Sequence, residues 1–155
     1  MVWSILLLAL LGGVGAALLA LLVWTRRRAI VVTLAGRSME PTFFAGDRVL
    51  VRRASLAEIG RNDVVLVHLP PPPDRHHGVP PPPGGFVPMV KRVAAVPGDA
   101  APPGYAAAGV RPGDVVPAGR LLLIGDNRLM SYDSRQLGYV DATAVVGVVT
   151  GKLSR

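Results

Sequence analysis

The sequence contains no cysteine, which excludes disulfide bonds, thiol nucleophiles and cysteine-based metal centres. Histidine is scarce: His68 falls in an apolar stretch, and His76 and His77 are adjacent in a proline-rich segment. No G-x-S-x-G turn accompanies them, so we do not expect a serine hydrolase that uses a histidine base. Adjacent histidines without a carboxylate at helical spacing also make a poor metal site. We therefore expect neither a metal nor another cofactor.

Lysine is rare as well, because among 17 basic residues only Lys91 and Lys152 are lysines. The net charge of +7 raises nucleic acid as a partner. However, the basic residues are scattered, and no helix-turn-helix, zinc-finger or aromatic RNA-binding pattern accompanies them. We expect no nucleic-acid partner. The simpler explanation is that the positive charge attracts the protein to anionic lipid headgroups. A lysine in so arginine-rich a chain stands out, particularly Lys91, which Arg92 follows.

Charge is absent from one long stretch, Val2 to Trp24, which consists mostly of Leu, Val, Ala and Gly. At ~1.5 Å per helical residue this stretch can cross a hydrocarbon core ~30 Å thick. A cleavable secretory signal is the competing interpretation, but such signals have a basic start and a shorter apolar core. Here Arg26–Arg28 instead follow the apolar stretch directly. We predict a retained membrane anchor in residues 1–28, with the transmembrane helix over about 2–24.

Long amphipathic helices are missing from residues 29–155. Short runs rich in β-branched residues, broken by Gly, Pro, Asp and Asn, predict a mainly β domain instead. The expected strands are Ala29–Ala35, Arg48–Arg53, Asp63–Leu69, Val87–Val96, Arg120–Ile124 and Tyr139–Gly151. Ser55–Ile59 is expected to form one helical turn. Two proline clusters make residues 69–85 a semi-rigid surface loop, either a simple insertion or a docking site for a proline-recognition module.

Three segments could carry chemistry. Ser38 lies in Gly36–Thr42, between a predicted strand and a turn stiffened by proline. Lys91 lies inside an apolar predicted strand, and Gly125–Arg135 gathers polar groups between two strands. Each segment alone has an ordinary explanation, namely a turn serine, a lysine that faces water, or a structural ion pair. Their occurrence together in one short chain favours a shared site.

In this order the segments resemble the type I signal peptidase family, which includes bacterial leader peptidases and mitochondrial inner-membrane peptidases. The resemblance covers Gly36 to about Val140. It rests on G-x-S-M-x-P-T at Gly36–Thr42, the strand that Asp47 opens, K-R-V…P-G-D at Lys91–Asp99, and G-D-N-R-x-x-S-x-D-S-R at Gly125–Arg135. It implies a mainly β, signal-peptidase-like catalytic core preceded by one N-terminal transmembrane helix. Two positions depart from the family: Ala95 and Asn62 stand where glycine is common.

The resemblance also implies roles for single residues. Ser38 would be the nucleophile, Lys91 its general base, and Ser131 the hydroxyl that orients the lysine. Burial would help Lys91, because it favours the neutral amine. The backbone N–H of Ser38 would stabilise the oxyanion, and Gly36 and Met39 beside it would help to bind oxyanion or substrate, with the second oxyanion donor left open. Four charged residues would support the site: Asp126, Arg128, Asp133 and Arg135.

The implied function is a membrane-bound serine endopeptidase that removes signal peptides from exported precursors and cuts after small residues. Its partners would be those precursors and the lipid bilayer, with the catalytic domain outside the cytoplasm. The positive-inside rule opposes this orientation, because Arg26–Arg28 follow the span and no basic residue precedes it. Two alternatives are a maturation peptidase for one precursor, possibly facing the cytoplasm, and a catalytically silent membrane scaffold.

Overall fold

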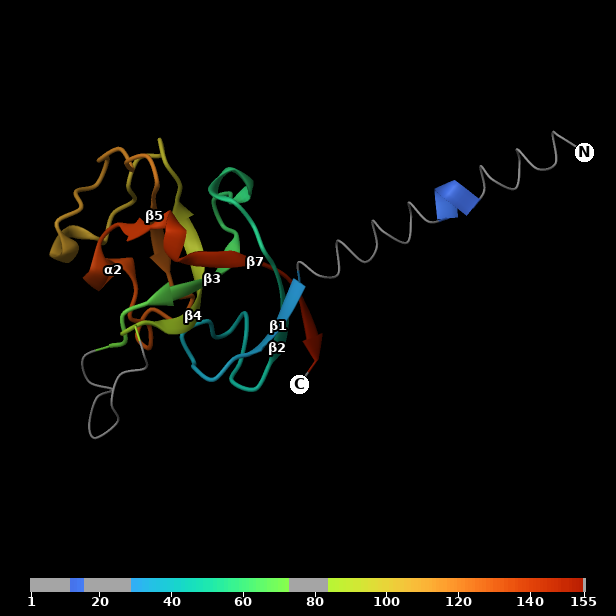
Figure 1. Cartoon of the computed structure of the whole chain (residues 1–155). Helices are drawn as coiled ribbons and strands as arrows, with labels where there is room; N and C mark the ends of the chain where they lie inside the picture. The colour runs from blue at the N-terminus through green and yellow to red at the C-terminus, as the bar shows by residue number, and fades with distance from the viewer. Residues whose placement is uncertain (1–11, 16–28, 73–83, 155) are drawn as a thin grey trace, which may run out of the picture. The chain divides into compact units, whose positions relative to one another are not determined.

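The structure is a computed structural model that describes residues 12–15, 29–72 and 84–154 (Figure 1). The chain divides into two compact units, Met1–Ile30 and Val31–Arg155. In the first unit residues 12–15 are helical, and the rest of the predicted membrane span lies outside the described residues. Within the described ranges we find no helix of the length and apolarity that crossing a membrane requires. Most of the predicted proline-rich loop, residues 73–83, also lies outside them.

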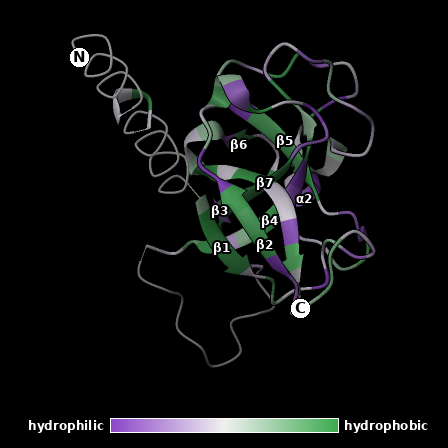
Figure 2. Cartoon of the chain, turned by 90° about the vertical axis from the view of Figure 1, so that its right-hand side faces the viewer, coloured by the Kyte–Doolittle hydropathy of each residue, from purple (hydrophilic) through white to green (hydrophobic). Residues whose placement is uncertain are grey.

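The second unit is mainly β, as the sequence predicts. Its strands, with β1 shared between the two units, are β1 Ala29–Thr33, β2 Arg48–Arg52, β3 Val64–Leu69, β4 Val87–Ala95, β5 Arg120–Ile124, β6 Val140–Asp141 and β7 Val145–Ser154. The helical segments are short: η1 Leu56–Glu58, η3 Ala106–Ala108, α2 Ser134–Leu137 and η4 Ala142–Ala144. Hydrophobic residues run along β1, β2 and β3, as the colours of Figure 2 show.

The strands form one sheet in the order β1-β2-β7-β3-β4-β5-β6. β3 and β4 are antiparallel partners, and Val65 stands opposite Lys91 in their register. β5 pairs with β4 only from Arg92 onward. The first half of β4, which ends at Lys91, therefore has β3 on one side and no named strand of the described chain on the other.

The core lies against this sheet. Val65, Val67 and Leu69 from β3 pack with Val93, Leu121 and other buried residues in one cluster. A second cluster surrounds Tyr105 and Leu122. Because alternate residues of a strand point to opposite faces, Val65, Val67 and Leu69 all point into the first cluster. The opposite face carries Leu66 toward the site described below.

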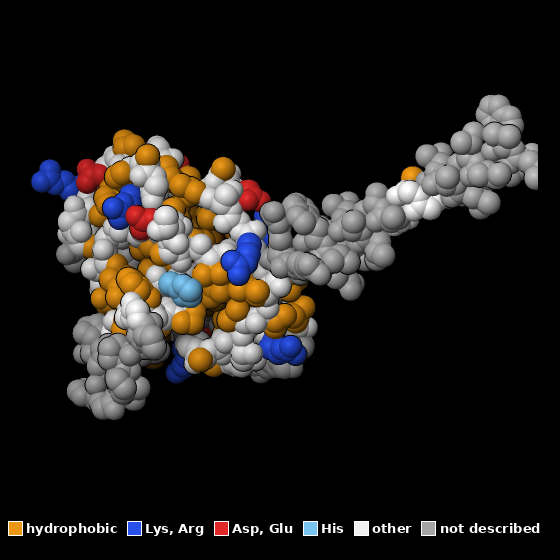
Figure 3. All heavy atoms as spheres, viewed as in Figure 1, with side chains coloured by type: hydrophobic (Ala, Val, Ile, Leu, Met, Phe, Trp, Pro, Cys, Tyr) orange, Lys and Arg blue, Asp and Glu red, His pale blue; other side chains and the backbone are white. Residues whose placement is uncertain are grey.

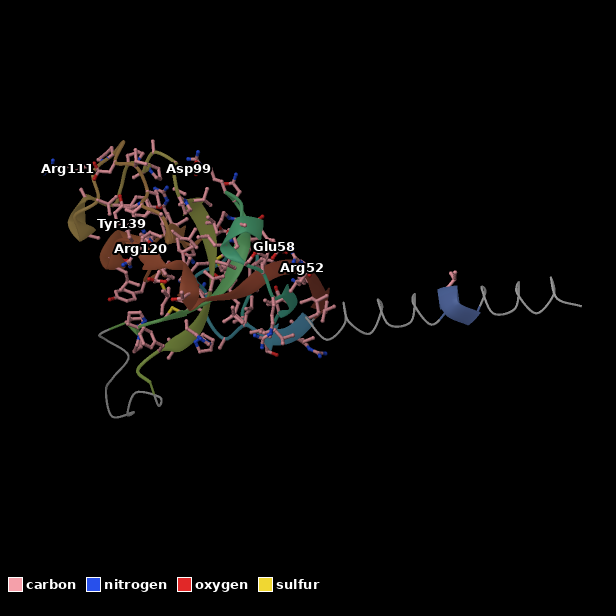
Figure 4. All side chains as sticks on the ribbon, turned by 45° about the horizontal axis from the view of Figure 1, so that its top comes forward. Arg52, Glu58, Asp99, Arg111, Arg120 and Tyr139 are labelled. Carbon is pink, nitrogen blue, oxygen red and sulfur yellow. The ribbon has the colours of Figure 1, made fainter. Side chains whose placement is uncertain are left out.

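The predicted helical turn at Ser55–Ile59 is confirmed as η1. The Glu58 side chain accepts hydrogen bonds from Ser55 and from Arg52, and Figure 4 labels the Arg52–Glu58 pair. Its bond from the Ser55 backbone, followed by those from Arg52 and the Ser55 hydroxyl, lowers the pKa of Glu58 to about 2. These contacts fix the connection between β2 and β3.

One local prediction was wrong, and one short helix was not predicted. The single strand expected at Tyr139–Gly151 is two strands, β6 and β7, separated by η4. The Asp141 side chain accepts the Thr143 N–H at 2.9 Å, which caps η4 and turns the chain. The helix α2 was not expected, because it is a single turn with an N-cap at Asp133.

Asn62, one of the two departures from the family pattern named above, has a backbone conformation that glycine also adopts readily. Its φ of 71° makes it the one non-glycine residue with positive φ among the residues described. Asparagine tolerates this left-handed conformation better than most residues. The turn into β3 therefore keeps its shape with either residue.

Candidate active site

Ser38 lies in a tight turn between β1 and β2, and it is half-buried. Its neighbour Met39 is 2% exposed and anchors the turn in the interior. The Phe43 N–H donates to the Met39 carbonyl at 2.9 Å. The Leu34 N–H donates to the Asp47 carbonyl at 2.9 Å, which holds the two ends of the segment together. The turn therefore presents Ser38 from a fixed backbone.

Lys91 is buried, with 1% of its surface exposed, in the middle of β4. Its Nζ donates a hydrogen bond to Ser131 Oγ at 2.9 Å. Val90 and Val93 on the same strand are buried as well. The structure thus brings Lys91 to Ser131, forty positions away in the chain, inside an apolar setting.

Asp133 continues this chain of contacts. Ser131 Oγ donates to Asp133 Oδ2 at 2.6 Å, and the Gly125 N–H donates to the same oxygen at 2.9 Å. Arg135 donates through Nε to Oδ1 at 2.9 Å. Burial alone would raise the pKa of Asp133, but the hydrogen bonds from Arg135, Gly125 and Ser131 outweigh burial and hold the pKa below its usual value. Asp133 is therefore an ionised anchor for Ser131.

Asp126 forms a separate ion pair with Arg92, the residue that follows Lys91. Arg92 donates to both carboxylate oxygens at 2.7 Å. This hydrogen bonding is the main reason why the pKa of Asp126 is lowered. The Arg92–Asp126 pair lies beside the site and links β4 to the segment after β5.

Three of the four charged residues expected to support the site form ion pairs: Asp133 pairs with Arg135, and Asp126 pairs with Arg92, which was not among the four. Arg128 takes part through its backbone carbonyl, which accepts from Arg135 Nη2 at 2.8 Å. The contacts of Arg92 were not predicted, although its position directly after Lys91 was a visible signal.

A cavity of about 230 Å³ joins Ser38 and Lys91. Residues 32–39 form one wall and Pro88–Lys91 form the other. Gly36 and Met39 line it, as do Met89, Met130 and Tyr132. A serine hydroxyl and a buried amine on one cavity are the groups that nucleophilic acyl transfer requires.

A second cavity of about 420 Å³ lies near the end of the β3–β4 hairpin, lined by His68, Phe86, Tyr139 and their neighbours. It is larger, but neither Ser38 nor Lys91 lines it. Size alone therefore does not identify the site; the nucleophile and base candidates do.

Other chemistries find little support in the described parts of the chain. No cluster of three or more His, Asp or Glu side chains is placed there to hold a metal ion. His76 and His77 lie outside the described residues. The face in Figure 3 shows basic side chains that are scattered among hydrophobic ones rather than gathered in one patch.

Comparison with known proteins identifies the family of the chain. The model of the family described as "Signal peptidase, peptidase S26" matches residues 5–101 and 104–153. Signal peptidase I V of Bacillus subtilis is 30% identical over 139 residues, which cover 74% of this chain and 80% of the relative. A signal peptidase I crystal structure from Enterococcus faecalis aligns with a TM-score of 0.37 at 21% identity, over 60% of this chain and 97% of that one. The chain therefore belongs to the signal peptidase family S26 and is a hydrolase of the serine endopeptidase type.

Proposed function

We propose that this signal peptidase is bound to the membrane and cleaves signal peptides from exported precursors with a Ser38–Lys91 dyad. The observation that carries the proposal is the shared cavity, which Ser38 and a Lys91 with 1% exposure both line. A lysine at the surface would be protonated and solvated. A lysine inside an apolar strand favours the neutral amine that a general base requires.

In the proposed reaction, Lys91 Nζ accepts the proton of Ser38 Oγ while that oxygen attacks the scissile carbonyl. The resulting ammonium then protonates the leaving amine as the peptide bond breaks, which leaves an ester on Ser38. Lys91 then deprotonates a water that attacks the ester, and it returns that proton to Ser38 Oγ as the ester bond breaks and the carboxylic acid product leaves. The backbone N–H of Ser38 stabilises the oxyanion, with Gly36 and Met39 shaping the same end of the cavity.

Ser131 and Asp133 orient the base in this scheme. A hydroxyl has one proton, and Ser131 uses that proton in its hydrogen bond to Asp133. The lone pairs of Ser131 Oγ are therefore available to accept the hydrogen bond from Lys91. An amine that donates one N–H to Ser131 keeps a lone pair with which to accept a proton. The ionised Asp133 thus fixes the direction of the Ser131 hydroxyl and, through it, that of Lys91.

The substrate chain lies extended along β4 in this proposal. The segment before Arg92 has an edge on which a peptide could add as a strand, opposite residues 32–36. The cavity would receive the substrate side chain next to the scissile bond. We propose that this side chain is small, as the family resemblance implies.

The membrane part of the proposal rests on the apolar stretch from Val2 to Trp24. We propose that it anchors the enzyme and that the catalytic unit works outside the cytoplasm, where exported precursors emerge. Phe44, Leu129 and Met130 are exposed hydrophobic residues of this unit, with Leu129 at 96%. A lipid surface near the site would cover such residues.

The decisive experiment is Lys91→Arg. Arginine keeps the positive charge but stays protonated in proteins, so it cannot act as a base. We expect cleavage of a precursor with small residues at the recognition positions to fall by at least ~10²-fold, to the level of Ser38→Ala. Rates are measured on membranes or detergent-solubilised full-length protein, with folding checked by circular dichroism.

Lys152→Arg is the matched control, because Lys152 pairs with the buried Asp47 at 2.6 Å and arginine can keep that pair. It should cleave like the wild type. If Lys91→Arg does not fold, Lys91→Met takes its place, because methionine fits a buried position without charge. We expect Lys91→Met to be inactive. Near-wild-type cleavage by Lys91→Arg, or by Ser38→Ala, would refute the dyad.

A further inference from the structure

The Asp126 carboxylate joins three segments that lie far apart in the sequence. Arg92 binds both of its oxygens at 2.7 Å, and the Arg92 Nη1 also donates to the Asn62 carbonyl at 2.9 Å. The Thr42 hydroxyl donates to Asp126 Oδ2 at 2.5 Å. Asp126 thus connects the turn that carries Ser38 with the strand that carries Lys91.

A second hydrogen bond joins the Ser38 turn to the segment that carries Asp126. The Asn127 N–H donates to the Ser38 carbonyl at 2.9 Å. Between these two ties the turn is closed by the bond from the Phe43 N–H to the Met39 carbonyl. A shift of Thr42 therefore cannot be absorbed within the turn without moving the backbone of Ser38.

The Thr42 bond is poorly suited to a purely structural role. Thr42 is exposed, so its hydroxyl could be satisfied by water. Asp126 already has both oxygens bound by Arg92. What the Thr42 bond adds is a fixed distance between the nucleophile turn and the residue beside the base.

We propose that Thr42 is a positioning residue, which acts through Asp126 and Arg92 to hold Ser38 in register with Lys91. The inference rests on the proposed dyad and adds a residue to it. Loss of the Thr42 hydroxyl leaves the cavity, the nucleophile and the base in place. The Ser38 turn then loses one of its two hydrogen bonds to residues 126–127, and reaction rates are sensitive to displacements of about 1 Å.

Thr42→Val tests this, because valine keeps the branched shape and removes the hydroxyl. We expect kcat for precursor cleavage to fall at least ~10-fold, with KM within ~2-fold of wild type and an unchanged melting temperature. Thr42→Ser, which restores the hydroxyl, should recover most of the rate. Thr42→Ala serves if the valine variant folds poorly.

Thr143→Val is the matched control. Thr143 is also part of a Thr–Asp hydrogen bond in an exposed position, to Asp141 Oδ1 at 2.6 Å, and it does not line the cavity of Ser38. It should retain the wild-type kcat. Wild-type kcat in both Thr42→Val and Thr42→Ala, or no recovery in Thr42→Ser, overturns the inference. If Ser38→Ala still cleaves at the wild-type rate, the dyad itself has failed, whatever Thr42 does.

Discussion

Asp133 shows how much a single side chain can decide in this site. Its carboxylate is fully buried, yet donors from Gly125, Ser131 and Arg135 surround it. It also caps α2 by accepting the Arg135 N–H at 3.1 Å. One ionised group therefore supports both the local backbone and the orientation of Ser131.

This arrangement predicts a pH dependence of stability. Because the folded-state pKa of Asp133 is lowered, its contribution is fully present above the unfolded value of ~3.9 and is lost as the pH falls through the folded value. Asp133→Asn should be less stable at neutral pH and lose less stability on acidification. Urea unfolding between about pH 2.5 and 7 measures this.

A free-energy difference between wild type and Asp133→Asn that stays constant with pH would contradict the assignment.

At the scale of elements, two glycines allow close approaches in different places. A Cβ at Gly125, just after β5, would lie 2.2 Å from Ser131 Oγ and 2.6 Å from the Ser38 carbonyl oxygen. A Cβ at Gly147 in β7 would lie 2.2 Å from the Arg52 carbonyl oxygen. The first contact is at the site, and the second is between β7 and the end of β2.

Gly125→Ala should therefore lower activity, whereas Gly147→Ala should lower stability. Gly125→Ala must displace Ser131 or the Ser38 turn, and we expect kcat per folded molecule to fall at least ~10²-fold. Gly147→Ala should lower the unfolding free energy by about 1–3 kcal/mol, because overpacking strains the β2–β7 pairing, while folded molecules stay active. Urea unfolding combined with cleavage rates separates the two, and equal kcat in both variants would argue against the close packing at Gly125.

The strands were predictable because β-branched residues recur at a period of two between Gly, Pro, Asp and Asn. Arg120–Ile124 was located to the residue. The single turn η1 was predicted, whereas α2 and η4, which Asp133 and Asp141 cap, were not, because so short a helix has no hydrophobic period to recognise. Ser38, Lys91 and Ser131 were predicted as site residues from motif order, and the structure places Lys91 and Ser131 in contact. Arg92 and Thr42 were missed as partners of Asp126, because 34 and 84 positions separate them from it.

At the scale of the whole molecule, the sheet order explains how distant motifs meet. β4 lies between β3 and β5, and the segment after β5 returns over it with Ser131 and Asp133. The Ser38 turn precedes β2 and reaches the same place through the Asn127 and Thr42 contacts. The fold therefore needs no accessory domain to assemble the described contacts.

The cavity lining has a consequence for chemical damage. Met39, Met89 and Met130 all line it, so three separate segments bring thioethers to one place in a chain that has four methionines and no cysteine. Peroxide converts a thioether to a polar sulfoxide, and it reaches exposed side chains first. Met130 is 56% exposed, whereas Met39 is 2% exposed.

We therefore expect hydrogen peroxide to inactivate the enzyme without unfolding it, in step with sulfoxide formation at Met130 as followed by mass spectrometry. Met130→Leu should slow the inactivation, and further replacement of Met89 by leucine should slow it more. Inactivation at the wild-type rate in the double variant would show that the damage lies elsewhere. Because the chain has no thiol to intercept an oxidant, peroxide damage to the described methionines would fall entirely on the cavity that Ser38 and Lys91 line.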